Sequence, residues 1–509
     1  MSCPRSTRVP CGGDVSVRVR IRRRRFLQGS AALAALPLAS SCPPPSGDAG
    51  VDGGHTLPTL DPSDYDGGEK TAFDPDAIAL DEVAFPLGVL SVAPDTESAA
   101  FTAKTTLDAA TLVVWRDTDE EGQKVVVHDA SHARGPSSTI VVRAGGMAPA
   151  TWYHYAFFVV DGDGNKTARS VIGRVRTAFP DEWLHPITIA AATCTNAEHQ
   201  PWTALSTMAN EEFDVFCHLG DMSYNDGAYS TGEYDVRWAA ALGDAGYRAI
   251  LPRAPLVATW DDHEITNNLN PQTIDDAHMR NAKDSFFAHV PMPRVDGATL
   301  GGQSGVDDSL FTTIRYGHTL ELIVLDGRTQ RTAVEQATST TAYLGAAQTA
   351  FLKETLKESP CRFKVVLNSV PITRMPELWA FANDRWQGYP AQREDLLAFL
   401  EDEGITDVWF LAGDFHMGFV GRVEPEGYAR RFYEVAVGPT GNLGNPLGLL
   451  AAQEEYREQV FPADQFPYGR GKLAATLLTF DPLARTVRIR FLDGGTGEPL
   501  FDEELTSAP

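Results

Sequence analysis

The sequence predicts a layered α/β fold whose functional residues lie where strands end. Apolar runs of strand length alternate with segments that have the spacing of amphipathic helices, and a short polar motif follows each of five such runs. These five runs are 187–192, 215–219, 254–258, 363–367 and 408–412. Strands that alternate with helices build layered sheets, and the ligand crevice of such sheets opens at the carboxyl ends of the strands.

A second sheet is predicted inside the α/β part, which spans residues 185–509. Helical patterns occupy 231–242, 276–288, 345–357 and 390–401. Apolar runs of strand length also occur at 309–316, 320–325, 432–437, 475–480 and 486–492. Because the late runs have no helix between them, we expect a second sheet and a four-layer α/β/β/α sandwich. This part of the chain has no apolar stretch long enough to cross a membrane.

Residues 84–178 have the pattern of β structure throughout. Apolar residues alternate with polar ones in short runs such as 111–115, 124–128 and 139–143, and clusters of turn residues separate the runs. No helical pattern interrupts them. We therefore expect an N-terminal β-sandwich of the immunoglobulin or fibronectin type III kind.

The first 42 residues have the pattern of an export signal. Four arginines, Arg22–Arg25, precede Phe26-Leu27 and a weakly apolar stretch that ends in small residues at Cys42. The arginine pair followed by Phe26-Leu27 is typical of the twin-arginine machinery, which exports folded proteins. The alternative is an ordinary secretory signal with additional arginines.

Cys42 stands where a lipoprotein carries its lipidated cysteine. We therefore expect a periplasmic or cell-surface protein with a lipid anchor on Cys42, or plain cleavage near this residue. Residues 43–83 are rich in Pro, Gly and Asp and are predicted to form a flexible tether. The chain has 68 acidic and 43 basic residues, and eight of the arginines lie within the signal. Such an acidic chain repels nucleic acids, so no nucleic-acid-binding surface is expected.

Three cysteines remain outside the signal, at positions 194, 217 and 361. An odd number in an exported protein argues against a disulfide framework. Cys217 lies within a predicted strand and Cys361 at the start of another, so both are interpreted as structural residues. Cys194 instead follows a strand at its carboxyl end, where a ligand would bind.

The polar residues at the strand ends fall into two groups by their ligand chemistry. Thiolate, phenolate and imidazole groups with one carboxylate suit ferric iron, and carboxylates with an amide carbonyl suit Ca²⁺, Mg²⁺ or Mn²⁺. The first set is Cys194, Tyr224 and His416, and the second is Asp221, Asp262, Asn368 and Asp414. A lone Asp after a strand is more often a cap or turn residue, a lone His in such a loop is usually structural, and Cys194 alone would be a core thiol. The prediction therefore rests on their convergence, with Asp221 as the carboxylate that bridges the two sets.

Two neighbouring cations would clamp the oxygens of a phosphoryl displacement and lower the pKa of a bound water. His263 follows Asp262 and would stand beside the metals, as a general acid to the leaving alkoxide or as a donor to the transition-state oxygens. These residues predict a metal-dependent phosphoesterase.

Three motifs then resemble the alkaline phosphatase D (PhoD-like) branch of the calcineurin-like metallophosphatases. They are Gly220-Asp221-x-x-Tyr224, Trp260-Asp261-Asp262-His263-Glu264 and Gly413-Asp414-Phe415-His416. The resemblance covers roughly residues 84–500. It implies an exported phosphomonoesterase or phosphodiesterase acting on small phosphate esters, with ferric iron held by Cys and Tyr and with calcium nearby.

Two further residues belong to the predicted site. Arg328 is a candidate phosphate clamp, because a guanidinium fork matches phosphate geometry, and the alternative is a surface salt bridge. Asp261 is expected to bind a metal or to orient a ligand. Two other functions stay open: a lipid-anchored binding protein with a degenerate phosphatase domain, and a hydrolase with Cys194 as nucleophile. The second leaves the carboxylates unexplained.

Overall fold

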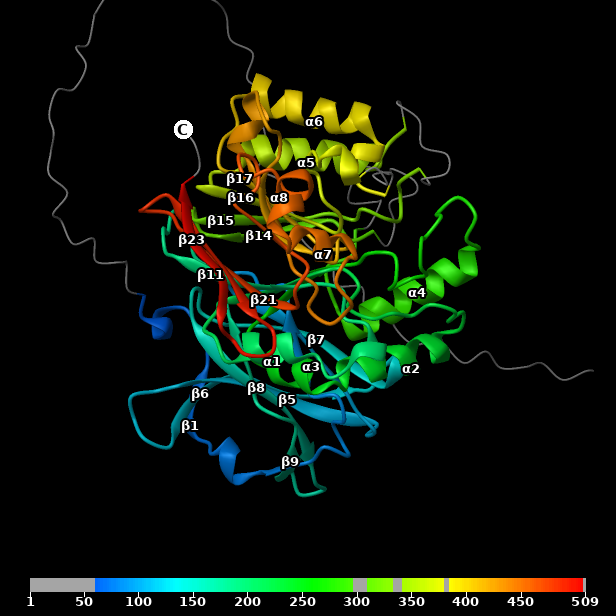
Figure 1. Cartoon of the computed structure of the whole chain (residues 1–509). Coiled ribbons are helices and arrows are strands. Elements are labelled where there is room, and N and C mark those ends of the chain that lie inside the picture. The colour runs from blue at the N-terminus through cyan, green and yellow to red at the C-terminus, as the bar shows by residue number, and fades with distance from the viewer. Residues whose placement is uncertain (1–59, 296–308, 333–340, 380–383, 507–509) are drawn as a thin grey trace, which may run out of the picture. The chain divides into compact units, whose positions relative to one another are not determined.

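The computed structural model describes residues 60–295, 309–332, 341–379 and 384–506, which are built around three β-sheets (Figure 1). The predicted export signal, with Cys42, and the first part of the predicted tether lie outside the described residues. No helix in these four ranges is both long and apolar enough to span a membrane.

The first central sheet holds three of the strands that precede the polar motifs. Its strands, in spatial order, are β23 (Pro499–Thr506), β22 (Thr486–Asp493), β21 (Ala474–Asp481), β11 (Ile187–Ala192), β12 (Val215–Leu219), β13 (Leu256–Thr259), β3 (Val89–Val92), β4 (Ser98–Lys104) and β7 (Thr139–Gly145). Strands β11, β12 and β13 run parallel. Their residues are all buried except Thr188, as expected for parallel strands that are covered on both faces.

The second central sheet holds the other two of these strands. Its order is β14 (Thr312–Tyr316), β15 (Leu320–Val324), β16 (Phe363–Asn368), β17 (Val408–Ala412), β19 (Tyr433–Ala436), β18 (Gly418–Arg422) and β20 (Tyr468–Arg470). Strands β15, β16, β17 and β19 are parallel. Asn368, the last residue of β16, and the polar residues after β17 therefore lie at the same edge of the sheet.

The two central sheets share one hydrophobic core. Leu322, Val365 and Leu411 join it from the second sheet, whereas their neighbours Ile323 and Val366 belong to a separate core on the opposite face. This alternation follows from the two-residue period of a strand. The opposite face is covered by α5 (Ala346–Glu358) and α6 (Pro390–Asp402), which lie above β15–β17 in Figure 1.

The other helices of the described residues follow strands of the first sheet or follow β19. They are α1 (Thr203–Ala209), α2 (Thr231–Leu242), α3 (Ala245–Ile250), α4 (Asp276–His289), α7 (Leu447–Ala451) and α8 (Glu454–Val460). The predicted helix at 231–242 is confirmed with the same bounds, because Ser230 and Glu233 form a capping box that sets its start. A mixed α/β fold is thus confirmed.

The third sheet comes from the N-terminal β region. Its order is β1 (Glu69–Ala72), β6 (Gln123–Ala133), β5 (Ala109–Asp117), β8 (Trp152–Val160), β9 (Lys166–Arg169) and β2 (Ala79–Leu80), and β10 (Gly173–Arg176) pairs with β8. Side chains of this sheet share a core with β3, β4 and β7. Strand β3 also pairs with β13 through Val92 and Leu256, so part of this region continues the first central sheet.

Two features differ from the expected organisation. Residues 60–83, assigned to the tether, carry β1 and β2, because edge strands β6 and β9 supply backbone partners and Arg116 holds Asp66 at 2.6 Å. The late strands β21 and β22 do not join the second sheet. Strand β21 returns to pair with β11, a pairing that no local pattern specifies.

We expect His289, at the end of α4, to make the free energy of unfolding of this protein sensitive to acid. Burial lowers its pKa to about 4, although its ring nitrogen donates to the Ser285 carbonyl. The unfolded chain binds the proton near pH 6.5, so the free energy of unfolding should fall as the pH drops from about 6.5 to 4. We expect this residue to account for up to about 3 kcal/mol of that loss.

Urea unfolding at pH 7 and pH 4.5 measures the effect. The variant His289→Phe keeps a ring against Trp238, on which His289 stacks with 5.5 Å between centroids. The variant should lose less stability on acidification than the wild type. An unchanged pH dependence would show that His289 is not responsible.

Candidate metal centre

The candidate site lies where strands of both central sheets end. Cys194 follows β11, Asp221 follows β12 and Asp414 follows β17. These three residues and His416 have positive φ angles between 53° and 59°. Non-glycine residues adopt such angles rarely, and those that do cluster at functional sites where the surrounding structure holds them.

Three groups of side chains in the described residues are close enough to hold a cation. They are Cys194 with Asp221 and His416, Asp221 with Asp262 and His263, and Asp221 with Asp261 and Asp414. Within each group the ligand atoms lie within 4.8 Å of one another. Asp221 belongs to all three groups, so one carboxylate connects the sulfur and nitrogen donors with the oxygen donors.

Two of the soft donors approach the same oxygen of Asp221. The Cys194 thiol is 3.6 Å from Asp221 Oδ2, and the Tyr224 hydroxyl donates to the same oxygen at 3.1 Å. Burial and the nearby carboxylates raise the pKa values of Cys194 and Tyr224. A bound cation would offset the free-energy cost of ionising these two groups, because it stabilises both thiolate and phenolate.

The hard donors include buried oxygens that have no hydrogen-bond partner among the described residues. The Oδ1 atoms of Asp221 and Asp262 are buried without a hydrogen-bond partner. Asn368 ends β16, where its carbonyl oxygen accepts from the Tyr343 hydroxyl at 2.9 Å and keeps a second lone pair. Burial and the neighbouring carboxylates raise the pKa values of Asp221 and Asp414. Buried oxygens of this kind fit a hard cation.

Arg328 lies inside this acidic cluster and not at its surface. Its side chain is fully buried and forks onto both oxygens of Asp261, with Nη2 at 2.7 Å from Oδ2. Nη1 donates to Asp384 at 2.9 Å, and Nη2 lies 3.7 Å from Asp262 and 4.0 Å from Asp414. A surface salt bridge is therefore excluded. In this arrangement the guanidinium neutralises carboxylates.

Asp226 is a functional candidate that the sequence did not single out. Its carboxylate accepts from His263 Nδ1 at 2.7 Å. Although burial opposes the charge, this hydrogen bond raises the pKa of His263. The His263 ring stacks on Tyr224 with 3.9 Å between centroids. Asp226 lies only two residues after Tyr224, and that proximity is the only signal that could have found it.

Glu264 holds the backbone beneath the site. Its carboxylate accepts from the backbone N–H groups of Asp221, Met222 and Asp261 at 2.5–3.0 Å. Burial raises the pKa of Glu264 to about 7, although these three hydrogen bonds favour the charged form. This carboxylate thus ties the loop after β12 to the loop after β13, which positions the acidic residues that both loops carry.

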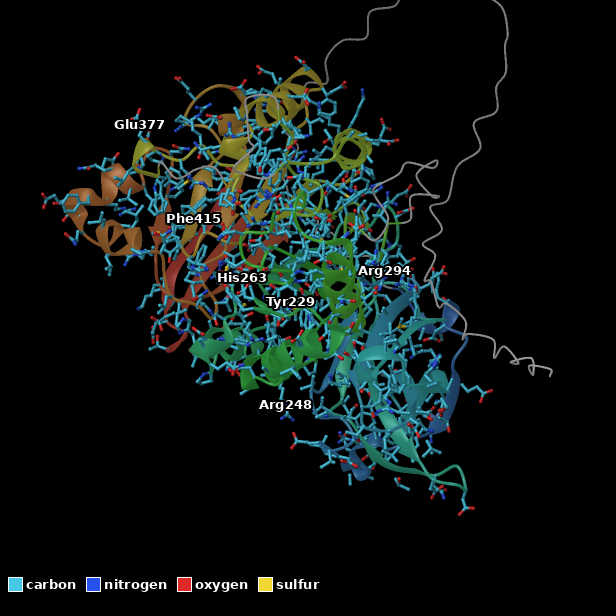
Figure 2. The ribbon with its side chains drawn as sticks, turned by 90° about the vertical axis from the view of Figure 1, so that its right-hand side faces the viewer. Tyr229, Arg248, His263, Arg294, Glu377 and Phe415 are labelled. Carbon is cyan, nitrogen blue, oxygen red and sulfur yellow. The ribbon has the colours of Figure 1, made fainter. Side chains whose placement is uncertain are left out.

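Figure 2 shows His263 and Phe415, which follow Asp262 and Asp414, in the same part of the molecule. They come from the loops after β13 and β17, which belong to different sheets. The structure thus brings most of the predicted ligands to Asp221, namely Cys194, Tyr224, Asp261, Asp262, Asp414 and His416. No contact between Asn368 and Asp221 is described. The sequence missed a further neighbour, Asn442, whose Nδ2 is 2.7 Å from the Tyr224 hydroxyl oxygen.

Comparisons with known proteins identify the family of this chain. Residues 189–472, more than half of the chain, match the model of the PhoD-like phosphatase family. The chain belongs to the PhoD-like phosphatase family. It is also 27% identical over 391 residues to alkaline phosphatase D of Bacillus subtilis (strain 168). That match covers 65% of this chain and 64% of the Bacillus protein, so it leaves about a third of each unmatched.

Two solved structures share the fold of this PhoD-like chain. The structure of PhoD matches with a TM-score of 0.68 and 21% identity, over 83% of this chain and 89% of that one. A purple acid phosphatase from yellow lupin (Lupinus luteus) seeds matches with a TM-score of 0.53 and 11% identity, over 82% of this chain and 73% of that one. At these identities the likeness concerns the fold.

Proposed function

We propose that this PhoD-like protein is an exported metal-dependent phosphoesterase that hydrolyses small phosphate esters. The observation that carries the proposal is the position of Asp221 in three overlapping groups of potential ligands. One shared carboxylate would bring two cations side by side, which is what a two-metal phosphoryl transfer requires. Membership of the PhoD-like phosphatase family supports the same reaction class.

The two sites would take different cations. Ferric iron suits Cys194, Tyr224, His416 and one oxygen of Asp221. Calcium, or else Mg²⁺ or Mn²⁺, suits the oxygens of the other set, namely Asp221, Asp262, Asn368 and Asp414. Asp261 is less suited to bind a cation, because both its oxygens already accept hydrogen bonds from Arg328. When bound, the cations supply positive charge to the phosphoryl oxygens and activate the attacking water.

The protein's own proton donor in this reaction is His263. Asp226 holds its Nδ1 and favours the protonated ring, so Nε2 carries a proton that can pass to the leaving alkoxide oxygen. Stacking on Tyr224 fixes the plane of the ring. Arg328 would act on phosphate only if a cation released it from Asp261, and we assign it the role of holding the acidic residues in place.

The rest of the chain fits an exported enzyme. We propose that residues 1–42 direct export by the twin-arginine machinery to the periplasm or the cell surface, and that Cys42 carries the lipid. We also propose that the two central sheets, with α5 and α6 against one outer face, form the inner layers of an α/β/β/α sandwich. The N-terminal sheet shares a core with β3, β4 and β7, which supports the proposal that this region is a β-sandwich.

The alternative of a lipid-anchored binding protein with a degenerate phosphatase domain is not favoured. A degenerate site would have lost some of its ligands, whereas Cys194, Asp221, Asp262, Asp414 and His416 all lie within the overlapping groups. The strained backbone at four positions of this site also has a cost, of order 1–3 kcal/mol each, which selection for folding alone would not retain.

Metal analysis and two model substrates test the proposal. Purified protein should contain iron and calcium, and it should hydrolyse p-nitrophenyl phosphate or bis-p-nitrophenyl phosphate. The ratio of the two rates distinguishes a monoesterase from a diesterase. Cys194→Ser should lose iron, and Cys217→Ser, a buried thiol within β12, should keep it. A metal-free wild-type protein that is inactive on both esters would refute the proposal.

A further inference from the structure

The loop after β19 runs beside Cys194 and is hydrogen-bonded to it. Gly441 forms a parallel β-bridge with Thr195. The Gly441 N–H donates to the Cys194 carbonyl at 3.2 Å, and the Asn196 N–H donates to the Gly441 carbonyl at 3.0 Å. The backbone of the loop is therefore fixed with respect to the residue that carries the thiol.

Close packing holds the same loop from the other side. A Cβ atom at Gly441 would lie 2.3 Å from Cδ1 of Trp202, so only glycine allows this approach. The Trp202 indole is itself fixed, because it donates to the Asn196 carbonyl at 2.9 Å. The residue that follows, Asn442, thus projects from a rigid piece of backbone.

The side chain of Asn442 reaches two of the predicted iron ligands. Its Oδ1 accepts from the Leu443 N–H at 2.7 Å, and this contact sets which end of the amide faces the site. Nδ2 then donates to the Tyr224 oxygen at 2.7 Å and lies 3.3 Å from Nε2 of His416. One amide group therefore touches both residues.

We propose that Asn442 is a positioning residue of the iron site, which orients Tyr224 and His416 relative to Cys194 and donates a hydrogen bond to the phenolic oxygen. The proposal rests on the function proposed above and adds a residue to it. A hydrogen bond to a ligating phenolate withdraws electron density from its oxygen and fixes the direction of its lone pairs. Residues that orient ligands in this way typically affect metal affinity or activity by 10- to 100-fold.

Iron bound to a phenolate has a charge-transfer band in the visible range, and this band reports on the phenolic oxygen directly. In iron-loaded Asn442→Ala, the band should shift to longer wavelength, because the phenolate becomes a better electron donor without the N–H group. The value of kcat/KM for p-nitrophenyl phosphate should fall by about 10- to 100-fold. Iron per chain is measured in the same samples, so the band is compared per bound ion.

Two further variants separate hydrogen bonding from packing. Asn442→Asp keeps the shape of the side chain but has no N–H group, so its band should differ from that of the wild type even if Asn442→Ala fails to fold. Asn445→Ala is the matched control, because Asn445 lies in the same loop and, among the residues that the structure describes, its side chain hydrogen-bonds to the Phe415 carbonyl and the Leu447 N–H and to no predicted iron ligand. This control should keep the wild-type band and activity.

The outcomes distinguish the two proposals. A wild-type band that is unchanged in Asn442→Ala and Asn442→Asp, with kcat/KM within twofold, would overturn the role of Asn442 and leave the proposed function intact. A wild-type protein that hydrolyses phosphate esters but has no such band would overturn the iron assignment, and with it the role of Asn442.

Discussion

Asp221→Asn is expected to lower kcat/KM for a phosphate ester by about 10³-fold and to reduce the content of both metals. The physical reason is that Asp221 is shared by all three groups of potential ligands, so its charge serves both cation sites. Metal ions supply several kcal/mol of charge stabilisation in the transition state, and each 1.36 kcal/mol corresponds to a tenfold change in rate. Steady-state kinetics and elemental analysis measure the two effects.

The same substitution should leave the metal-free protein as stable as the wild type or more stable. Burial and the charges of Asp261, Asp262 and Glu264 raise the pKa of Asp221, which means that its ionised form is unfavourable in the fold. Removing this charge relieves the repulsion. Loss of activity without loss of stability distinguishes a functional carboxylate from a structural one.

Asp244→Asn is the control. Asp244 is buried and caps α3 by accepting from the Gly246 N–H, a role that asparagine performs equally well. Its metal content and activity should equal those of the wild type. If Asp221→Asn retained both metals and activity within tenfold, the shared-carboxylate assignment would be wrong.

Arg328→Gln is expected to destabilise the metal-free protein by about 3–5 kcal/mol. Removing one partner of a buried ion pair leaves the other charge unpaired, and that cost is typically of this size. Arg328 is fully buried between Asp261 and Asp384, and it also lies near Asp262 and Asp414. Chemical unfolding in the presence of a chelator measures the loss.

Added calcium should restore more stability to Arg328→Gln than to the wild type, because a cation replaces the charge that the guanidinium supplied. Arg331→Gln is the matched control. Arg331 is equally buried and binds Asp384 at 2.6 Å, but no contact with Asp261 is described for it. Its calcium response should be that of the wild type. Equal calcium responses in all three proteins would contradict the role of Arg328 within the acidic cluster.

Local patterns determined much of this protein. The bounds of β11, β12 and β17 agree with the apolar runs, because a buried parallel strand consists mostly of apolar residues and ends where polar ones become frequent. The residues after those strands, Cys194 and Asp221 among them, were therefore visible as candidates. The residue types alone also divide these candidates into soft and hard donors.

Long-range packing decided the remaining features. No sequence pattern connects Asn442 to Tyr224 or Arg328 to Asp261, because each pair is separated by a long stretch of chain and meets only in the tertiary structure. The pairing of β21 with β11 could not be predicted for the same reason, since strand pairing between distant segments depends on the packing of the whole core. The sequence by itself determined which groups stand at strand ends, whereas the tertiary structure decided which of them touch.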